Sequence, residues 1–83
     1  MKVTVAATQM ACSWDTKQNI EKATNIIHKA ADSGAEIILL QELFETPYFC
    51  IDTKNEHFDL AKTIAEQPTI RSMQVIAKDR GVV

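Results

Sequence analysis

The sequence has 83 residues, a length that seldom holds more than one hydrophobic core, so we expect one domain at most. Its hydrophobic fraction of 46% and charged fraction of 24% are those of a globular protein and exclude an intrinsically disordered chain. The formal net charge is -2 and the Lys and Arg residues are scattered, so there is no electrostatic basis for binding nucleic acid or an anionic membrane surface.

The cysteines and the apolar segments indicate a compartment. Cys12 and Cys50 lie far apart and form neither a CxxC motif nor a Cys/His cluster, which argues against a disulfide framework and against a metal site. No apolar run approaches the roughly 18 residues of a membrane span. Met1-Lys2 leads into a strand-like segment rather than a signal peptide. We therefore expect a cytoplasmic protein with no membrane partner.

A strand followed by an amphipathic helix is predicted first. Residues 3–8 are rich in β-branched side chains, which favours a strand. Asp15 and Gln18 resemble a capping box, in which the Asp side chain accepts from an early helical N–H and the Gln side chain reaches back. Over residues 20–31 apolar side chains recur every three or four positions, which predicts a helix of about four to five turns. Gly34 suits the left-handed position that ends it.

The second half of the sequence predicts two more strands and two more helices. Residues 37–40 are apolar without alternation, which indicates a parallel strand buried on both faces and completes a right-handed βαβ unit. A short helix is expected around residues 57–65. A clearer helix follows Pro68 and stops at Gly81, and one of its faces carries Ile70, Met73, Ile76 and Ala77. Residues 82–83 start a third strand and leave the sheet unfinished, so we expect a truncated part of a larger α/β domain.

The loop after the second predicted strand, residues 41–50, is the candidate functional site. Ligands of open α/β sheets bind beyond the carboxyl ends of the strands. Glu42 is the acid nearest to the strand end. Its apolar neighbours Leu40, Leu43 and Phe44 would desolvate the carboxylate and make it a usable general base. The alternative is that Glu42 caps a turn or faces water, because acidic residues are common after strands.

Three segments, taken together and in order, resemble the nitrilase (carbon–nitrogen hydrolase) superfamily. They are VAATQM at residues 5–10, a helix that carries Asn19, and AEIILLQEL at residues 35–43 followed by Pro47-Tyr48. The resemblance covers essentially the whole chain. Within the superfamily, residues 11–15 and 41–50 most resemble the N-carbamoylputrescine amidase branch.

The resemblance implies a fold and a set of catalytic residues. The fold is an αββα sandwich, of which residues 1–83 are the N-terminal βαβ(α) portion of a single domain. The implied catalytic triad is Glu–Lys–Cys, with Glu42 as its general base and with the Lys and Cys beyond Val83. Many members have Pro before this Glu, whereas this chain has Gln41. The family has an aromatic residue at the position of Tyr48, which makes Tyr48 a candidate substrate-binding residue.

The resemblance also implies a reaction and an assembly. The intact protein is expected to be an amidohydrolase that converts N-carbamoylputrescine, a small carbamoylated amine, to putrescine, carbon dioxide and ammonia. No metal and no organic cofactor are needed for this chemistry. Such enzymes commonly form homo-oligomers. The 83-residue chain alone lacks a matching nucleophile, so we expect it to be inactive.

Alternatives remain open for several residues and for the function. Cys50 with His57 could form a nucleophile–base pair, although a structural thiol is the plainer reading. Tyr48 could pack instead of binding substrate, and Glu45 could face a cationic amine. The protein could also be another amidase of the superfamily or a non-catalytic α/β binding fragment. A phosphate-binding module would require a glycine-rich motif after the first strand, and this chain has only two glycines, Gly34 and Gly81.

Overall fold

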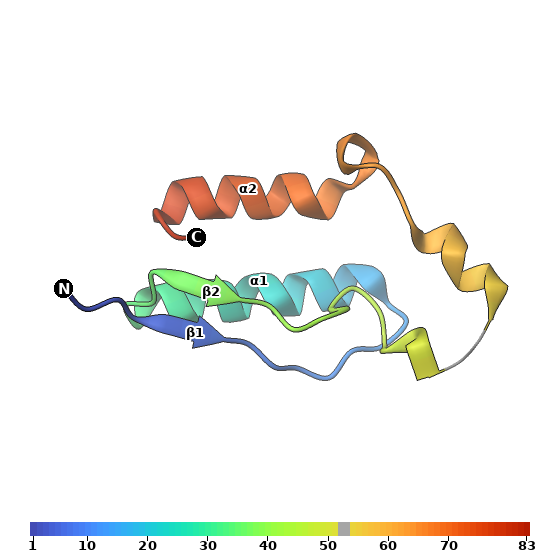
Figure 1. Ribbon diagram of the computed structural model, residues 1–83, viewed down its shortest axis with the longest axis horizontal. Helices are drawn as coiled ribbons and strands as arrows, with labels where there is room; N and C mark the ends of the chain where they lie inside the picture. Colours follow the sequence, from blue (N-terminus) through green and yellow to red (C-terminus); the bar gives the residue numbers. More distant parts are fainter. Residues whose placement is uncertain (52–53) are drawn as a thin grey trace.

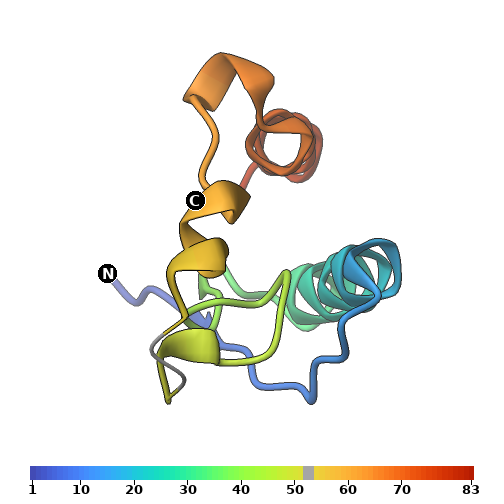
Figure 2. The same ribbon diagram turned by 90° about the vertical axis from the view of Figure 1, so that its right-hand side faces the viewer.

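The computed structural model describes residues 1–51 and 54–83 as one layer of strands covered by two helices (Figure 1). In chain order the elements are β1 (Val5–Ala7), α1 (Thr16–Asp32), β2 (Ile37–Leu39), three short 3₁₀-helices η1 (Phe49–Ile51), η2 (Asn55–Leu60) and η3 (Ile64–Glu66), and α2 (Pro68–Arg80). Figure 2 looks along the helices and shows α1 and α2 on the same side of the strands.

The two strands are parallel, as the sequence predicts. Their register pairs Val5 with Ile37, Ala6 with Ile38 and Ala7 with Leu39. The last residue lies along the other edge of β2: Val83 N–H donates to Glu36 O over 2.9 Å, and Ile38 N–H donates to Val83 O over 2.8 Å. This is the hydrogen-bond pattern of a parallel pair, so β2 lies between β1 and Val83 at this point. The sheet of the described residues has two strands, so the third strand expected from residues 82–83 stays a prediction.

The sheet is covered on one face only, which contradicts the prediction that the second strand is buried on both faces. The other face carries Val5, Ile37 and Leu39, whose exposures are 66%, 43% and 70%. Both described α-helices lie on the opposite side of the sheet, so the helices do not shield Val5, Ile37 and Leu39 from solvent. Alternation between half-buried and exposed residues therefore replaces the uniform burial that an apolar run suggests.

The ends of α1 follow local sequence rules. The Asp15 side chain accepts from Gln18 N–H over 3.1 Å, which confirms the predicted N-cap. The second half of the capping box is wrong, because Asp15 N–H donates to the Ser13 hydroxyl over 3.2 Å instead of to Gln18. At the other end Gly34 has a φ of 96°, in the left-handed region expected of a residue just past a helix.

The connection between β2 and α2 differs from the prediction of one short helix around residues 57–65. It forms two separate 3₁₀-helices, η2 and η3, because Ala61 is extended with φ −70° and ψ 137°. The Thr63 hydroxyl then accepts from Glu66 N–H over 3.3 Å, which starts a new turn rather than continuing the old one.

The predicted helix after Pro68 is confirmed as α2. Proline occupies its first turn, where a missing N–H costs nothing, and Gly81 ends it with a φ of 64°. An ion pair between Arg80 and Asp32 joins the C-terminal ends of α2 and α1. Of the helices in the described ranges, none combines the length and apolar character needed to cross a membrane.

Candidate functional site

The candidate site lies at the end of the molecule toward which both strand arrows point, on the right in Figure 1. Two segments leave the sheet there, one after β1 and one after β2. The β1–β2 pairing continues into this region, since Thr8 N–H donates to Leu39 O over 2.9 Å. The loop at residues 41–46, called the Glu42 loop below, therefore starts next to the segment at residues 8–15, as expected for the carboxyl edge of a parallel pair.

Asn19 of α1 joins these two segments. It is the most buried large side chain of the described structure, with 1% exposure. Its Oδ1 accepts from Ser13 N–H over 3.0 Å, and its Nδ2 donates to Ser13 O over 2.6 Å and to Glu45 O over 2.7 Å. Both amide hydrogens are used, and a buried amide that is satisfied in this way fixes the positions of its partners. The segment after β1 and the Glu42 loop thus share one anchor.

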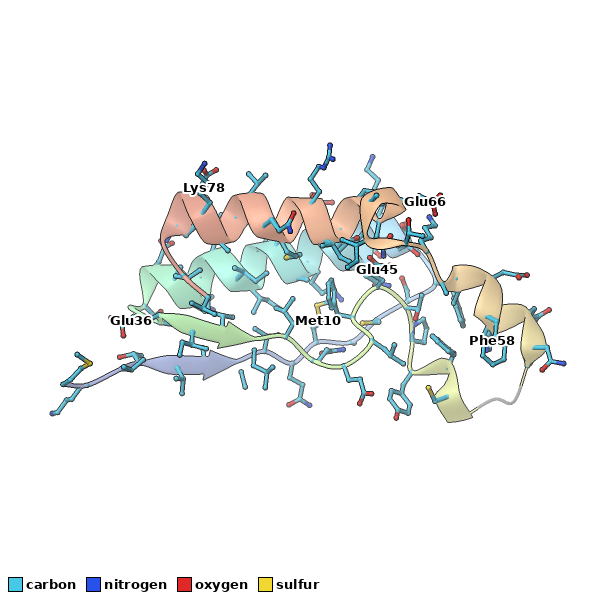
Figure 3. All side chains as sticks on the ribbon, turned by 45° about the horizontal axis from the view of Figure 1, so that its top comes forward. Met10, Glu36, Glu45, Phe58, Glu66 and Lys78 are labelled. Carbon is cyan, nitrogen blue, oxygen red and sulfur yellow. The ribbon has the colours of Figure 1, made fainter. Side chains whose placement is uncertain are left out.

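Gln41 and Cys12 form a second connection between the same segments. Gln41 Oε1 accepts from Met10 N–H over 2.6 Å, and Gln41 Nε2 lies 3.5 Å from Cys12 Sγ as a donor. The thiol of Cys12 in turn donates to Phe44 O over 3.3 Å. The loop is therefore held both before and after Glu42, and Figure 3 shows Met10 beside it.

The backbone of the Glu42 loop is strained at one position. Leu43 has a φ of 55°, in the left-handed region that residues with a side chain rarely occupy. A conformation of this kind costs on the order of 1 kcal/mol or more and persists only where the surroundings enforce it. Here the enforcing contacts are those of Gln41 on one side and of Phe44 and Glu45 on the other. The sequence contains no glycine at this turn, so the strain could not be predicted.

Glu42 itself is exposed at the turn of this loop. The prediction that Leu40, Leu43 and Phe44 desolvate its carboxylate is therefore wrong for this part of the chain. Leu43 and Phe44 are half-buried and line an apolar groove, whereas Glu42 is exposed and does not line it. Its position is set by the contacts of its neighbours, which leaves the carboxylate available to groups that approach from outside the described residues.

Glu45 connects the Glu42 loop to α2. Its Oε1 accepts from Gln67 Nε2 over 2.9 Å, at the residue that precedes the helix. Figure 3 shows the Glu45 side chain at this end of α2, near Glu66. The idea that Glu45 faces a cationic amine is not tested, but one of its two oxygens is already occupied by the Gln67 amide.

The comparisons with known proteins agree with this arrangement. The family model described as carbon–nitrogen hydrolase matches residues 4–83. The chain belongs to the carbon–nitrogen hydrolase family. Its mixed helix and strand structure with a small parallel sheet fits an α/β portion of such a hydrolase, and the resemblance of the three sequence segments is confirmed.

Three relatives in this family carry two informative names. The N-carbamoylputrescine amidase of Solanum tuberosum is 49% identical over 81 residues, covering 98% of this chain and 27% of that protein. The N-carbamoylputrescine amidase of Arabidopsis thaliana is 44% identical over 82 residues, covering 99% and 27%. The citrullinase of Francisella tularensis is 36% identical over 81 residues, covering 98% and 28%. The chain thus spans little more than a quarter of the length of these relatives.

Three further candidate residues of this chain are Tyr48, Cys50 and His57, and the last two line the same apolar groove. Tyr48 is 52% exposed. Cys50 is an exposed free thiol. His57 stacks on Trp14, with ring centroids 5.8 Å apart, and tilts against Phe49 at 4.9 Å. Aromatic rings rather than a nucleophile therefore orient His57, which disfavours a Cys50–His57 pair.

An apolar groove of about 1130 Å³ separates the Glu42 loop from α2. Its walls include Phe44, Phe49, Phe58, Ile70 and Met73, and Tyr48 does not line it. In residues 1–51 and 54–83, no three His, Cys, Asp or Glu side chains are grouped so that they could hold a metal ion.

Asn19→Ala is expected to destabilise the full-length polypeptide that carries this chain by about 1 to 3 kcal/mol, because it removes the hydrogen bonds between the buried Asn19 amide and backbone groups of Ser13 and Glu45. Asn19→Asp should destabilise at least as much, since a carboxylate oxygen would then face two carbonyl oxygens. Urea unfolding measures both effects. Asn25→Ala, at an exposed position of the same helix, is the control, and an equal loss of stability in Asn19→Ala and Asn25→Ala would contradict the anchoring role.

Proposed function

We propose that the full-length polypeptide that carries this chain is an amidohydrolase that cleaves N-carbamoylputrescine, with Glu42 as its general base. The main support is that a chain 49% identical to an N-carbamoylputrescine amidase holds an exposed carboxylate on an anchored loop at the carboxyl edge of its sheet. Residues 1–83 are, in this proposal, the N-terminal portion of one domain with an αββα sandwich fold. The exposed apolar face of β1 and β2 is consistent with a further layer there.

The proposed chemistry needs a base that can approach a thiol. The Glu42 carboxylate takes the proton of a cysteine thiol, and the thiolate attacks the carbamoyl carbon of the substrate. A lysine ammonium stabilises the negative charge that develops on the carbamoyl oxygen. The Lys and Cys are expected beyond Val83. An exposed Glu42 suits this role, because a carboxylate already bound within these residues would have to break that contact first.

The leaving groups follow from the carbamoyl chemistry. Collapse of the first adduct releases ammonia, because the departing nitrogen takes the proton that Glu42 had accepted. The carbamoyl group, which still carries the putrescine nitrogen, stays joined to sulfur as a thiocarbamate, and Glu42 is again a carboxylate. Glu42 then deprotonates a water molecule that breaks this bond and restores the thiol. The released carbamic acid separates into carbon dioxide and putrescine. The steps on the enzyme are proton and acyl transfers, and a carbamic acid loses carbon dioxide without a catalyst, so the proposal includes no metal or organic cofactor.

The setting of the enzyme is part of the proposal. We expect a cytoplasmic homo-oligomer that acts on a small carbamoylated amine and has no nucleic-acid or membrane partner. The net charge of -2 is consistent with the absence of polyanionic partners.

Glu42→Gln in the full-length polypeptide is expected to lower kcat for ammonia release from N-carbamoylputrescine by at least about 100-fold, because the amide has the shape of the carboxylate but cannot take a proton. Glu36→Gln is the matched control, since Glu36 is also exposed and lies at the opposite end of β2. Near-normal turnover in Glu42→Gln would contradict the role of Glu42. Citrulline, tested in parallel because one relative is named citrullinase, distinguishes the substrates: faster turnover of citrulline would contradict the proposed substrate but not the reaction class.

Tyr48→Ala is expected to raise KM several-fold with a smaller change in kcat, because loss of a substrate contact that is equal in the ground and transition states affects binding alone. Tyr48→Phe keeps the ring and removes the hydroxyl, so it separates packing against substrate from hydrogen bonding. Steady-state kinetics of both variants provide the measurement. An unchanged KM with a lowered unfolding temperature would show that Tyr48 only packs.

A further inference from the structure

Gln41, the residue directly before Glu42, makes contacts that its position in the chain does not require. Glu42 is exposed, but the side chain of Gln41 binds Met10 in the segment after β1, 31 positions away in the sequence. We propose that Gln41 is a positioning residue for Glu42, acting together with Cys12. This inference rests on the proposed function of Glu42 and adds a specific cause for the placement of that carboxylate.

The Gln41 amide has a single orientation in this network. Met10 N–H can only donate, so the group 2.6 Å from it must be the carbonyl oxygen Oε1 of Gln41. The amide nitrogen Nε2 is then directed at Cys12 Sγ, 3.5 Å away. Rotation of the amide by half a turn would place two donors against each other at Met10. Both polar atoms of the Gln41 amide are therefore held by hydrogen bonds, which also restricts the backbone conformation of Gln41.

Cys12 carries the same constraint to the other side of Glu42. Its sulfur accepts from Gln41 Nε2, and its thiol hydrogen donates to Phe44 O over 3.3 Å. One chain of donors and acceptors therefore runs from Met10 N–H through Gln41 and Cys12 to Phe44. Glu42 and the strained Leu43 lie between the two ends of this chain. The network therefore fixes the turn at Gln41 and at Phe44, the residues on either side of Glu42 and Leu43.

The consequence for catalysis is geometric. Proton transfer requires heavy atoms within roughly 2.6 to 3.2 Å, and a misplacement of about 1 Å can cost on the order of 100-fold in rate. The exposed Glu42 side chain is positioned by the backbone from which it projects. Release of Gln41 would let Leu43 leave its left-handed conformation and move the carboxylate. The substrate would still bind, because the side chain of Gln41 contacts Met10 and Cys12 and does not line the apolar groove.

Gln41→Ala in the full-length polypeptide is therefore expected to lower kcat by on the order of 10- to 100-fold with KM nearly unchanged. Cys12→Ala should lower kcat by a smaller factor, and Cys12→Ser, whose hydroxyl can both accept and donate, should recover most of that loss. Gln18→Ala, at an exposed position of α1, is the control for removal of a glutamine side chain. Rates are normalised to the concentration of active sites, so that a misfolded fraction does not count as lost turnover.

The decisive comparison repeats Gln41→Ala in the Glu42→Gln background. If Gln41 acts through Glu42, the second substitution costs little once the carboxylate is gone, and the two effects are strongly non-additive. The same fold-loss in both backgrounds, or an unchanged kcat in Gln41→Ala alone, would overturn the positioning role. Wild-type protein that releases no ammonia from any carbamoylated amine would instead overturn the proposed function, and the role of Gln41 with it.

Discussion

The arrangement of this chain depends on one buried side chain, the amide of Asn19. The apolar core of the described residues is small, with Ala23, Ile27 and Ala35 as its buried members. Burial of an amide costs free energy unless its hydrogen bonds are made, and Asn19 makes them with Ser13 and Glu45. Because these partners are backbone groups of two different loops, the bonds that compensate the burial also set the distance between the loops. Apolar contacts are less directional and would not fix this distance as closely.

This constraint separates the support of the Glu42 loop from its exposed surface. Asn19 binds the backbone of Glu45. Gln41 binds Met10, and Cys12 binds Phe44. Glu42 lies between these contacts and stays exposed. A general base must be placed accurately and must also be free to exchange protons with another group. Both requirements are met when the contacts belong to the neighbours of the base and not to the base itself. Leu43 then carries the backbone strain that this placement costs.

Local rules predict much of the fold, and long-range contacts account for what they miss. The cap at Asp15 and the stop at Gly34 follow from side-chain chemistry within a few residues. The parallel pairing of the two strands follows from their order, strand–helix–strand. All three are confirmed. The amide contacts of Asn19 and Gln41 join residues 26 and 31 positions apart. The spacing of apolar residues along the sequence does not predict hydrogen bonds between such distant side chains and backbone groups. The exposure of Glu42 is one of the two alternatives that the sequence left open. The exposure of one sheet face was not predicted, because burial depends on which layers are present. The sequence indicates Glu42 as a candidate through its position after a strand and through the family resemblance. Its catalytic role stays a prediction.

The measurement that tests the central claim most directly is a crystal structure of the full-length polypeptide. We expect a Glu42 carboxylate oxygen within about 2.6 to 3.2 Å of a cysteine sulfur or of a water molecule bound beside it. We also expect the contacts of Asn19 with Ser13 and Glu45 to be retained. A Glu42 side chain that points away from every cysteine, while those Asn19 contacts are intact, would show that the anchored loop serves a purpose other than presenting a catalytic base.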